Sequence, residues 1–292
     1  MITVRIKGGL GNQLFQYALG YTLSKKFNQG LAFNPSFTSN MTPRGYKLSS
    51  LMVLNSNIVD DAELALKVRV LKNKYINKAC RLVGSGEIYR YKNGIYFLEK
   101  DDSFQAGVFK LREKDIYLDG YFQSENYFKK YRKELLHQIV PVYMPENEYI
   151  EVLEQVKIGN SVAIHVRHGD FSKDNNPYHY LLGEKYYRNA LKFIEEHVER
   201  PILFWFSDDI DWVKQNFGEK DNYRFVSLHT SHADIDEMML MKNCHHIITA
   251  NSTFSWWAGW LNEHEDAIRI CPAKRYGNKE MIPDRWEKIG VE

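Results

Sequence analysis

Apolar and polar positions alternate most regularly in the second half of the chain. There, short runs of β-branched and aromatic residues are separated by longer segments with helical periodicity. The predicted strands are 162–166, 202–206, 224–228, 247–250 and 268–271, and the predicted helices between them are 184–199, 209–217, 234–243 and 254–262. Such alternation is typical of βαβ units, so we predict an α/β fold with a parallel sheet.

The first half of the chain is less regular. Its pattern predicts strands at 2–6, 31–34 and 116–122, and helices at 13–27 and 60–82. The segment from Pro141 to Pro145 is the candidate hinge. We therefore expect two Rossmann-like domains, 1–150 and 151–292, that face a cleft in which a ligand binds.

Composition narrows the class of protein. The 292 residues are 44% hydrophobic, which supports a substantial core, and 39 basic residues balance 37 acidic ones. Because the basic and acidic residues nearly balance, the net charge gives no reason to expect nucleic acid as a partner. Cys80, Cys244 and Cys271 are too few and too scattered for a disulfide or zinc framework. No apolar run is long enough to span a bilayer, so we expect a cytoplasmic protein.

One charged segment has two interpretations. Residues 67–81 include six basic residues and no acidic one, and Asp60, Asp61 and Glu63 precede them. The plain interpretation is a solvated helix whose charges suit its dipole. The alternative is peripheral contact with the anionic cytoplasmic face of a membrane.

The first candidate site is the end of the strand in "SVAIHVRHGDF". With alternating side chains, His165 and Arg167 share one face where a parallel sheet opens, and Gly169 and Asp170 follow. Ligands bind outside the carboxyl ends of such strands, and a guanidinium binds phosphate as a planar fork. The alternative is a structural histidine with an Arg–Asp pair at the surface.

The second candidate is the strand–turn–helix in "ITANSTFSWWAGWL". Asn251, Ser252 and Thr253 form a predicted capping turn, and Phe254 opens a helix. Free N–H groups at a helix start bind anions. Ordinary capping explains the hydroxyls equally well, and the tryptophans in this helix are more often packing residues than functional ones.

The third candidate consists of acidic residues in two predicted first turns. Asp208 follows a strand, and the Asp-x-Asp triplets 209–211 and 234–236 match a short signature of metal-dependent sugar transferases. Acidic side chains in the first turn of any helix also interact favourably with its dipole. For most of these residues, that structural role is the alternative.

The fourth candidate is "GGLGNQ" near the start of the chain. Its glycine spacing differs from the dinucleotide fingerprint, and the second strand ends in Asn34 where that fingerprint needs an acid. Bare backbone at Gly9 and Gly11 would let a ligand approach, and Asn12 and Gln13 could hydrogen-bond sugar hydroxyls. A glycine turn with an asparagine cap is the alternative.

In this order, "GGLGNQLFQYA", "HVRHGD", "FSDDIDWVK" and "ITANSTFSWWAGWL" resemble the motifs of bacterial α-1,2-fucosyltransferases. The likeness spans nearly the whole chain and is weakest over 33–115. His168 stands where relatives commonly carry a second arginine, and Phe171 where many carry tyrosine. The resemblance implies a GT-B-like fold, an inverting transfer from GDP-fucose without metal or other cofactor, and a galactose-terminated oligosaccharide as acceptor.

The resemblance also implies roles for single residues. Arg167 contacts the β-phosphate with His165 beside it, the turn 251–253 followed by Phe254 holds the phosphates, and Asp236 contacts guanine with Asp208 nearby. Asn12 and Arg167 act in the transfer, Gly9, Gly11 and Gln13 line the acceptor side, and Asp170 is the candidate base, although departing phosphate could also take the proton. A non-catalytic sugar-nucleotide or glycan-binding protein, a protein O-fucosyltransferase and a transferase for another nucleotide sugar remain alternatives.

Overall fold

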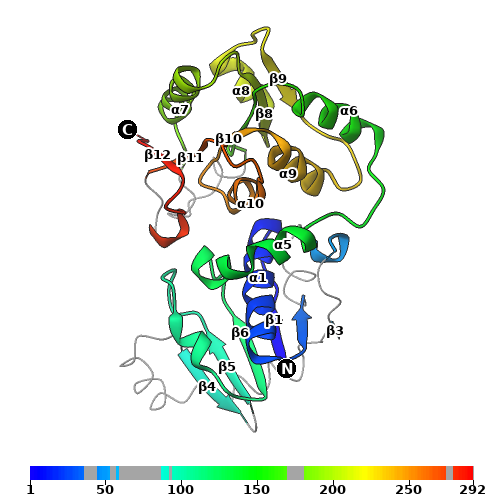
Figure 1. The fold of residues 1–292 in the computed structure, drawn as a ribbon, viewed down its shortest axis with the longest axis vertical. Coiled ribbons are helices and arrows are strands. Elements are labelled where there is room, and N and C mark those ends of the chain that lie inside the picture. Colours follow the sequence, from blue (N-terminus) through cyan, green and yellow to red (C-terminus); the bar gives the residue numbers. More distant parts are fainter. Residues whose placement is uncertain are drawn as a thin grey trace. The chain divides into compact units, whose positions relative to one another are not determined.

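The computed structural model describes residues 1–35, 45–52, 57–58, 87–91, 94–169, 181–273 and 279–291 (Figure 1). The chain divides into two compact units, Met1–Val142 and Tyr143–Glu292, and each contains a six-stranded sheet. The division falls within the proline-bearing segment 141–145. Over the described residues, no helix is both long and apolar enough to cross a membrane. The predicted helix 60–82 and the basic segment 67–81 lie outside the described residues.

The sheet of the first unit has the order β3-β2-β1-β6-β5-β4. Its neighbouring strands are parallel except for the pair β4 and β5. The first and last of these strands in chain order, β1 and β6, therefore lie side by side at the centre of the sheet. The strands are β1 (Ile2–Arg5), β2 (Leu31–Asn34), β3 (Asn57–Ile58), β4 (Glu87–Tyr91), β5 (Gly94–Leu98) and β6 (Asp115–Asp119).

Helix α1 (Leu10–Phe27) follows β1 and is buried along most of its length, including the amides of Gln13 and Gln16. A Cβ on Gly20 would lie 2.6 Å from Cγ2 of Val4, so this glycine lets the helix approach the sheet closely. The helix ends at Asn28, whose φ of 52° is left-handed. The other helical elements are α5 (Arg132–Gln138) and the 3₁₀ turns η1 (Leu48–Ser50), η2 (Ala106–Lys110), η3 (Glu125–Tyr127) and η4 (Lys129–Tyr131).

The sheet of the second unit is parallel throughout, with the order β12-β11-β10-β7-β8-β9. Every residue of β7 is buried, as expected for a strand that is covered on both faces. Chain order reverses between β7 and β10. The strands are β7 (Ser161–Val166), β8 (Ile202–Ser207), β9 (Tyr223–Val226), β10 (His246–Ile248), β11 (Arg269–Pro272) and β12 (Glu287–Ile289).

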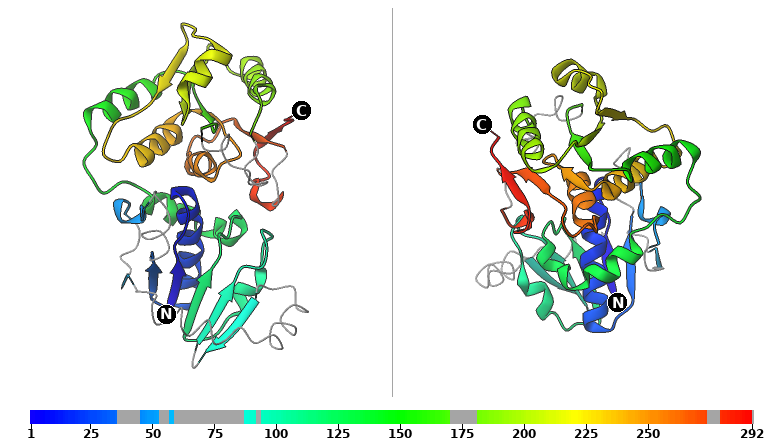
Figure 2. Two further views of the ribbon diagram at one scale, coloured as in Figure 1. Left: turned by 180° about the vertical axis from the view of Figure 1, so that it is seen from behind. Right: turned by 45° about the horizontal axis from the view of Figure 1, so that its top comes forward.

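The helices of the second unit follow the strands as the pattern predicted. Helix α9 contacts both α6 and α10, and the two further views show the same arrangement (Figure 2). The elements are α6 (Asn147–Val156), α7 (Glu184–His197), α8 (Ile210–Phe217), α9 (Ala233–Asn243), α10 (Thr253–Leu261) and η6 (Lys279–Met281). The predicted α/β fold with parallel sheets is therefore confirmed.

One predicted boundary is wrong in an informative way. The strand expected at 116–122 ends at Asp119, because residues 120–123 form a turn in which Phe122 has a φ of 54°. A β-strand cannot continue through a left-handed residue. The hairpin of β4 and β5 and the helices α5 and α6 were not predicted from the sequence.

Candidate active site

Arg167 and Asp208 meet where β7 and β8 end. The parallel register places Val166 beside Ser207, so the residues after both strands emerge at one edge. Nη1 of Arg167 lies 3.2 Å from Oδ2 of Asp208. Oδ1 of Asp208 accepts the backbone N–H groups of His168 at 2.9 Å and Gly169 at 3.1 Å. Asp208 therefore fixes both the guanidinium and the turn that follows it.

The ionisation of Asp208 follows from these contacts. Burial opposes the charged form, but the N–H of His168, the Arg167 guanidinium and the N–H of Gly169 outweigh it and lower the pKa of Asp208. A Cβ on Gly169 would lie 3.2 Å from the Asp208 carbonyl oxygen, so the turn is tight against its anchor. Asp208 is thus a carboxylate in the folded protein near neutral pH.

His165 lies one strand position before this pair and is only 4% exposed. Burial and the positive charge of Arg167 lower the pKa of His165 to about 3. Its Nδ1 has no hydrogen-bond partner among the described residues. The imidazole is therefore neutral, and its ring centroid lies 5.4 Å from that of Phe254.

The contact with Phe254 brings the second candidate motif to the same edge. Ile248 of β10 pairs with Ile164 of β7, so the turn at 251–252 and the start of α10 follow β10 beside the end of β7. Ser252 is the N-cap of α10, and its Oγ accepts the N–H of Phe254 at 3.3 Å. The predicted capping turn is thus present, and it places a helix N-terminus next to His165.

The tryptophans of α10 are core residues. Trp256, Trp257 and Trp260 are at most 1% exposed, and Nε1 of Trp256 donates to the Met281 carbonyl at 2.6 Å. A Cβ on Gly259 would lie 2.9 Å from the Trp286 ring. The tryptophans are therefore packing residues, as the plain interpretation of the sequence had it. They hold α10 in place, and the N-terminus of α10 belongs to the candidate site.

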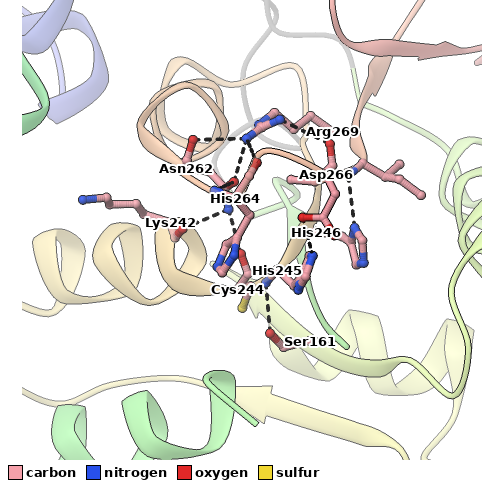
Figure 3. A network of polar contacts seen from close by, with 11 residues as sticks. Ser161, Lys242, Cys244, His245, His246, Asn262, His264, Asp266 and Arg269 are labelled. Carbon is pink, nitrogen blue, oxygen red and sulfur yellow. Dashed lines mark hydrogen bonds and ion pairs between the residues drawn. The ribbon is translucent and has the colours of Figure 1, made fainter. Parts of the chain in front are cut away.

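The other end of α10 is fixed by a polar network that Figure 3 shows from close by. The Arg269 guanidinium donates to the carbonyls of Gly259, Asn262 and His264. The Asn262 amide donates in turn to the carbonyls of Lys242 at 3.0 Å and Cys244 at 2.7 Å. These bonds satisfy the carbonyls that a helix C-terminus leaves unpaired. The network adjoins the beginning of β10, the end of the strand opposite the candidate site.

The acidic triplets have structural partners. Asp209 caps α8 by accepting the Trp212 N–H at 3.1 Å, and its other oxygen lies 2.8 Å from Nδ1 of His168. Asp236 is 2% exposed and accepts the hydroxyls of Tyr143 at 2.7 Å and Thr230 at 2.6 Å. Among the described residues, no cluster of three or more acidic, histidine or cysteine side chains could hold a metal ion.

The glycine-rich stretch of the first unit is arranged around Gln13. This residue is fully buried, and its amide donates to the carbonyls of Gly8 at 2.9 Å and Gly45 at 2.8 Å while accepting the Lys47 N–H at 2.9 Å. Gly9 is the N-cap of α1 and Gly11 is buried in its first turn. In this structure, Gln13 therefore holds a loop in place.

Asn12 has a different partner, which the sequence alone did not suggest. Its Oδ1 accepts Nε2 of Gln123 at 2.8 Å, from the turn that follows β6. The same turn is linked to a cluster in which Arg5 and Lys7 each lie 2.8 Å from the Asp119 carboxylate. The signal that could have revealed it is "DGYFQSENYF", where aromatic and amide side chains gather at the end of a strand. Asp170, the predicted base, lies outside the described residues.

The family model for glycosyl transferase family 11 matches residues 1–288. The chain belongs to this family. The resemblance seen in the four motifs is thereby confirmed, and the family 11 chain is a glycosyltransferase.

Proteins similar to this chain are sugar transferases according to their names. An α-1,2-colitosyltransferase of Escherichia coli is 29% identical and covers 99% of each chain. The O-antigen biosynthesis glycosyltransferase WbnK of Escherichia coli is 27% identical over 96% of this chain and 98% of its own. A galactoside 2-α-L-fucosyltransferase of Caenorhabditis elegans is 23% identical over 100% of this chain and 79% of its own.

Solved structures confirm the fold. FUT1 of Arabidopsis thaliana in complex with GDP matches with a TM-score of 0.52 and 13% identity, over 99% of this chain and 73% of that one. The fucosyltransferase NodZ from Bradyrhizobium matches with a TM-score of 0.52 and 13% identity, over 88% of this chain and 90% of that one. At these identities the likeness concerns architecture, which is that of GT-B-like fucosyltransferases.

Proposed function

We propose that this family 11 chain transfers L-fucose with inversion from GDP-β-L-fucose to the 2-hydroxyl of a terminal β-galactoside in a surface glycan. The observation that carries the proposal is the edge of the second sheet where chain order reverses. There the Arg167 guanidinium is held by Asp208 beside the N-terminus of α10. A fixed cation and a helix N-terminus at such an edge suit a diphosphate.

The chemistry of this donor makes stabilising the leaving group the central requirement. A bond forms between the acceptor oxygen and the anomeric carbon as the bond from that carbon to the β-phosphate oxygen breaks, with its electron pair passing to GDP. Arg167 and the backbone N–H groups at the start of α10 would receive the charge that develops there. The acceptor proton passes to Asp170 or to the departing phosphate. Neutral His165 adds no second cation but borders the same space through its contact with Phe254.

A specific observation favours a second donor. The colitosyltransferase relative matches this chain from end to end. Colitose differs from fucose only in lacking the 3-hydroxyl, so the same diphosphate site would serve both donors. A pocket built to hydrogen-bond that hydroxyl discriminates strongly against the sugar without it, whereas a pocket that merely admits it does not.

A donor and acceptor panel tests the proposal. The purified chain is incubated with GDP-fucose, GDP-colitose, GDP-mannose or UDP-galactose, together with methyl β-galactoside, lactose or methyl β-glucoside. Released nucleotide, product mass and the linkage from NMR are measured. We expect GDP release and an α-1,2-linked fucosyl galactoside. Product from GDP-colitose and none from GDP-fucose would show that colitose is the sugar transferred. Tight binding of GDP-fucose without product would favour the non-catalytic alternative.

The expectation of metal-independent transfer has its own test. Activity is measured after treatment with EDTA and after adding back Mg²⁺ or Mn²⁺. We expect unchanged rates, because Arg167 and the α10 N-terminus would perform the charge stabilisation that a divalent ion gives other transferases. Complete loss in EDTA with recovery on adding metal would contradict this.

A further inference from the structure

The first and last strands of the first unit's sheet, β1 and β6, lie side by side and parallel, and the proposed donor site does not use them. The segments that leave their carboxyl ends are 7–9 and 120–123. In open α/β sheets, ligands bind outside the carboxyl ends of the strands. This edge is therefore the first place to look for a second ligand.

The turn after β6 is held in a strained conformation. Phe122 is fully buried with a φ of 54°, a region that bulky residues rarely adopt. Gly120 has no space for a side chain, because a Cβ would lie 2.4 Å from Cβ of Glu99. The Glu99 carboxylate accepts the N–H groups of Tyr121 at 2.5 Å and Phe122 at 2.8 Å. Strain of this kind persists only where the surroundings over-determine it, often at binding sites.

Two amide side chains tie this turn to the start of the chain. Gln16 is fully buried, donates to the carbonyls of Gly120 at 3.1 Å and Lys7 at 3.2 Å, and accepts the Lys7 N–H at 3.0 Å. Gln123 donates to Asn12 at 2.8 Å. Side-chain hydrogen bonds thus tie the segment after β1 to the turn after β6.

Tyr121 lies in this turn and is 38% exposed. Nζ of Lys7 lies 4.7 Å from the centroid of this ring and 2.8 Å from the Asp119 carboxylate. The ammonium therefore contacts the aromatic ring while its own position is set by an ion pair. An aromatic ring on this turn, with an ammonium over it and the Gln123–Asn12 amide pair at the end of the same turn, combines an apolar surface with hydrogen-bonding groups.

We propose that Tyr121, with Lys7, Asn12 and Gln123, forms the subsite for the acceptor sugar. A pyranose has a face rich in C–H groups, which would pack on the ring face opposite Lys7, and hydroxyls at its edge, which the amides of Asn12 and Gln123 would bind, while Lys7 holds the ring from its other face. Glu99 is a positioning residue that holds the turn. The assignment of a hexopyranoside as the ligand rests on the proposed function.

The test uses the full-length chain with Tyr121→Leu, which keeps bulk but removes the ring, and Tyr121→Phe, which keeps the ring. Ile150→Ala, at a position of 39% exposure in α6, is the matched control for losing an exposed apolar side chain. The measurements are the KM for methyl β-galactoside with whichever donor is turned over, the kcat, the affinity for GDP, the thermal midpoint, and saturation-transfer NMR of the galactoside with GDP present.

Tyr121→Leu is expected to raise the KM for the galactoside about tenfold, the order of one aromatic contact, with GDP affinity and thermal midpoint near wild type. Tyr121→Phe should restore most of the acceptor binding, and Ile150→Ala should change nothing. A turn that is merely structural would instead lower the thermal midpoint and affect donor and acceptor alike.

The possible failures are distinguishable. Equal NMR signals and KM values in wild type and Tyr121→Leu would overturn the subsite alone. Loss of galactoside binding in Tyr121→Leu, in a chain that does not use GDP-fucose, would overturn the donor assignment while supporting the subsite. A wild-type chain that binds no galactoside would contradict both.

Discussion

Arg167 and Asp208 are joined by an ion pair of 3.2 Å across the ends of two neighbouring parallel strands. The same carboxylate binds two backbone N–H groups of the turn that follows Arg167. An ion pair built into a turn sets the direction of a guanidinium before any ligand arrives, and such preorganisation is what makes a charged group effective in transfer chemistry.

Arg167→Lys keeps the positive charge but loses the planar fork. We expect kcat/KM with the donor to fall about 10²- to 10³-fold, with little change in the thermal midpoint. The matched control is Arg188→Lys on the surface of α7, where Arg188 pairs with Glu184 at 2.8 Å. Wild-type turnover in purified Arg167→Lys would exclude the phosphate role.

Asp208→Asn removes the charge and keeps the shape. Because the pKa of Asp208 is lowered in the folded chain, its carboxylate stabilises the fold above the unfolded pKa, and this stabilisation is lost as pH falls through the folded value. We expect the variant to be less stable by about 1–3 kcal/mol at pH 7, from weakened hydrogen bonds to a charged acceptor.

Urea unfolding of wild type and Asp208→Asn as a function of pH measures this difference. It should shrink as pH falls to about 4 and below, where the unfolded-state carboxyl protonates. A difference that stayed constant down to acidic pH would mean that the charge of Asp208 is not what stabilises the turn.

Two glycines of the first unit should respond differently to the same change. Gly120→Ala would place a Cβ within 2.4 Å of Glu99 and 2.7 Å of the Phe122 ring, whereas a Cβ on Gly30 meets nothing within 4 Å. We expect Gly120→Ala to destabilise the fold by about 1–3 kcal/mol and to raise the acceptor KM. Gly30→Ala should leave both nearly unchanged, as chemical unfolding and acceptor kinetics would show.

His246 also makes stability depend on pH, but here the folded chain disfavours the charged form of the side chain, whereas at Asp208 it favours the charged form. Burial, followed by the neighbouring His245, lowers the pKa of His246 to about 4, and its Nδ1 accepts the Ile268 N–H at 3.0 Å. His264 and Arg269 oppose protonation further, while Asp266 favours it. Between pH 6.5 and about 4 the unfolded chain binds more protons here than the folded one, so this group makes stability fall as pH falls.

The variant His246→Asn tests this, since an asparagine oxygen can accept the Ile268 N–H without titrating. We expect its unfolding free energy to depend less steeply on pH than that of wild type across this window. His165 and the other titrating groups are common to both proteins and cancel in the comparison. Parallel slopes for the two proteins would show that folding does not lower the pKa of His246.

The sequence predicted the second unit well because its strands are buried on both faces. Continuous β-branched runs such as 162–166 signal such strands directly, and each lies within two residues of the observed element. The first unit was harder to predict. Its hairpin of β4 and β5 mixes tyrosines with aliphatic residues, which makes its strands less distinct, although Asn93-Gly94 is a hairpin turn signal in the sequence.

In the candidate site, too, local motifs could be predicted from the sequence and tertiary contacts could not. The motif residues His165, Arg167, Ser252 and Phe254 were predicted, and the structure brings them to one edge. The partnership of Arg167 with Asp208 depends on the register of β7 against β8, which no local pattern encodes. The role of Tyr121 likewise depends on tertiary contacts from Glu99 and Lys7, so its exposure on a rigid turn could not be read from alternation alone.

Trp212 stacks on His168 with ring centroids 4.5 Å apart, whereas the other five tryptophans of the chain are buried. The one indole within reach of a water-borne quencher therefore stands next to the turn that carries Arg167. The chain thus contains its own optical reporter: acrylamide quenching and the red edge of its fluorescence spectrum would follow occupancy of this edge without any added dye.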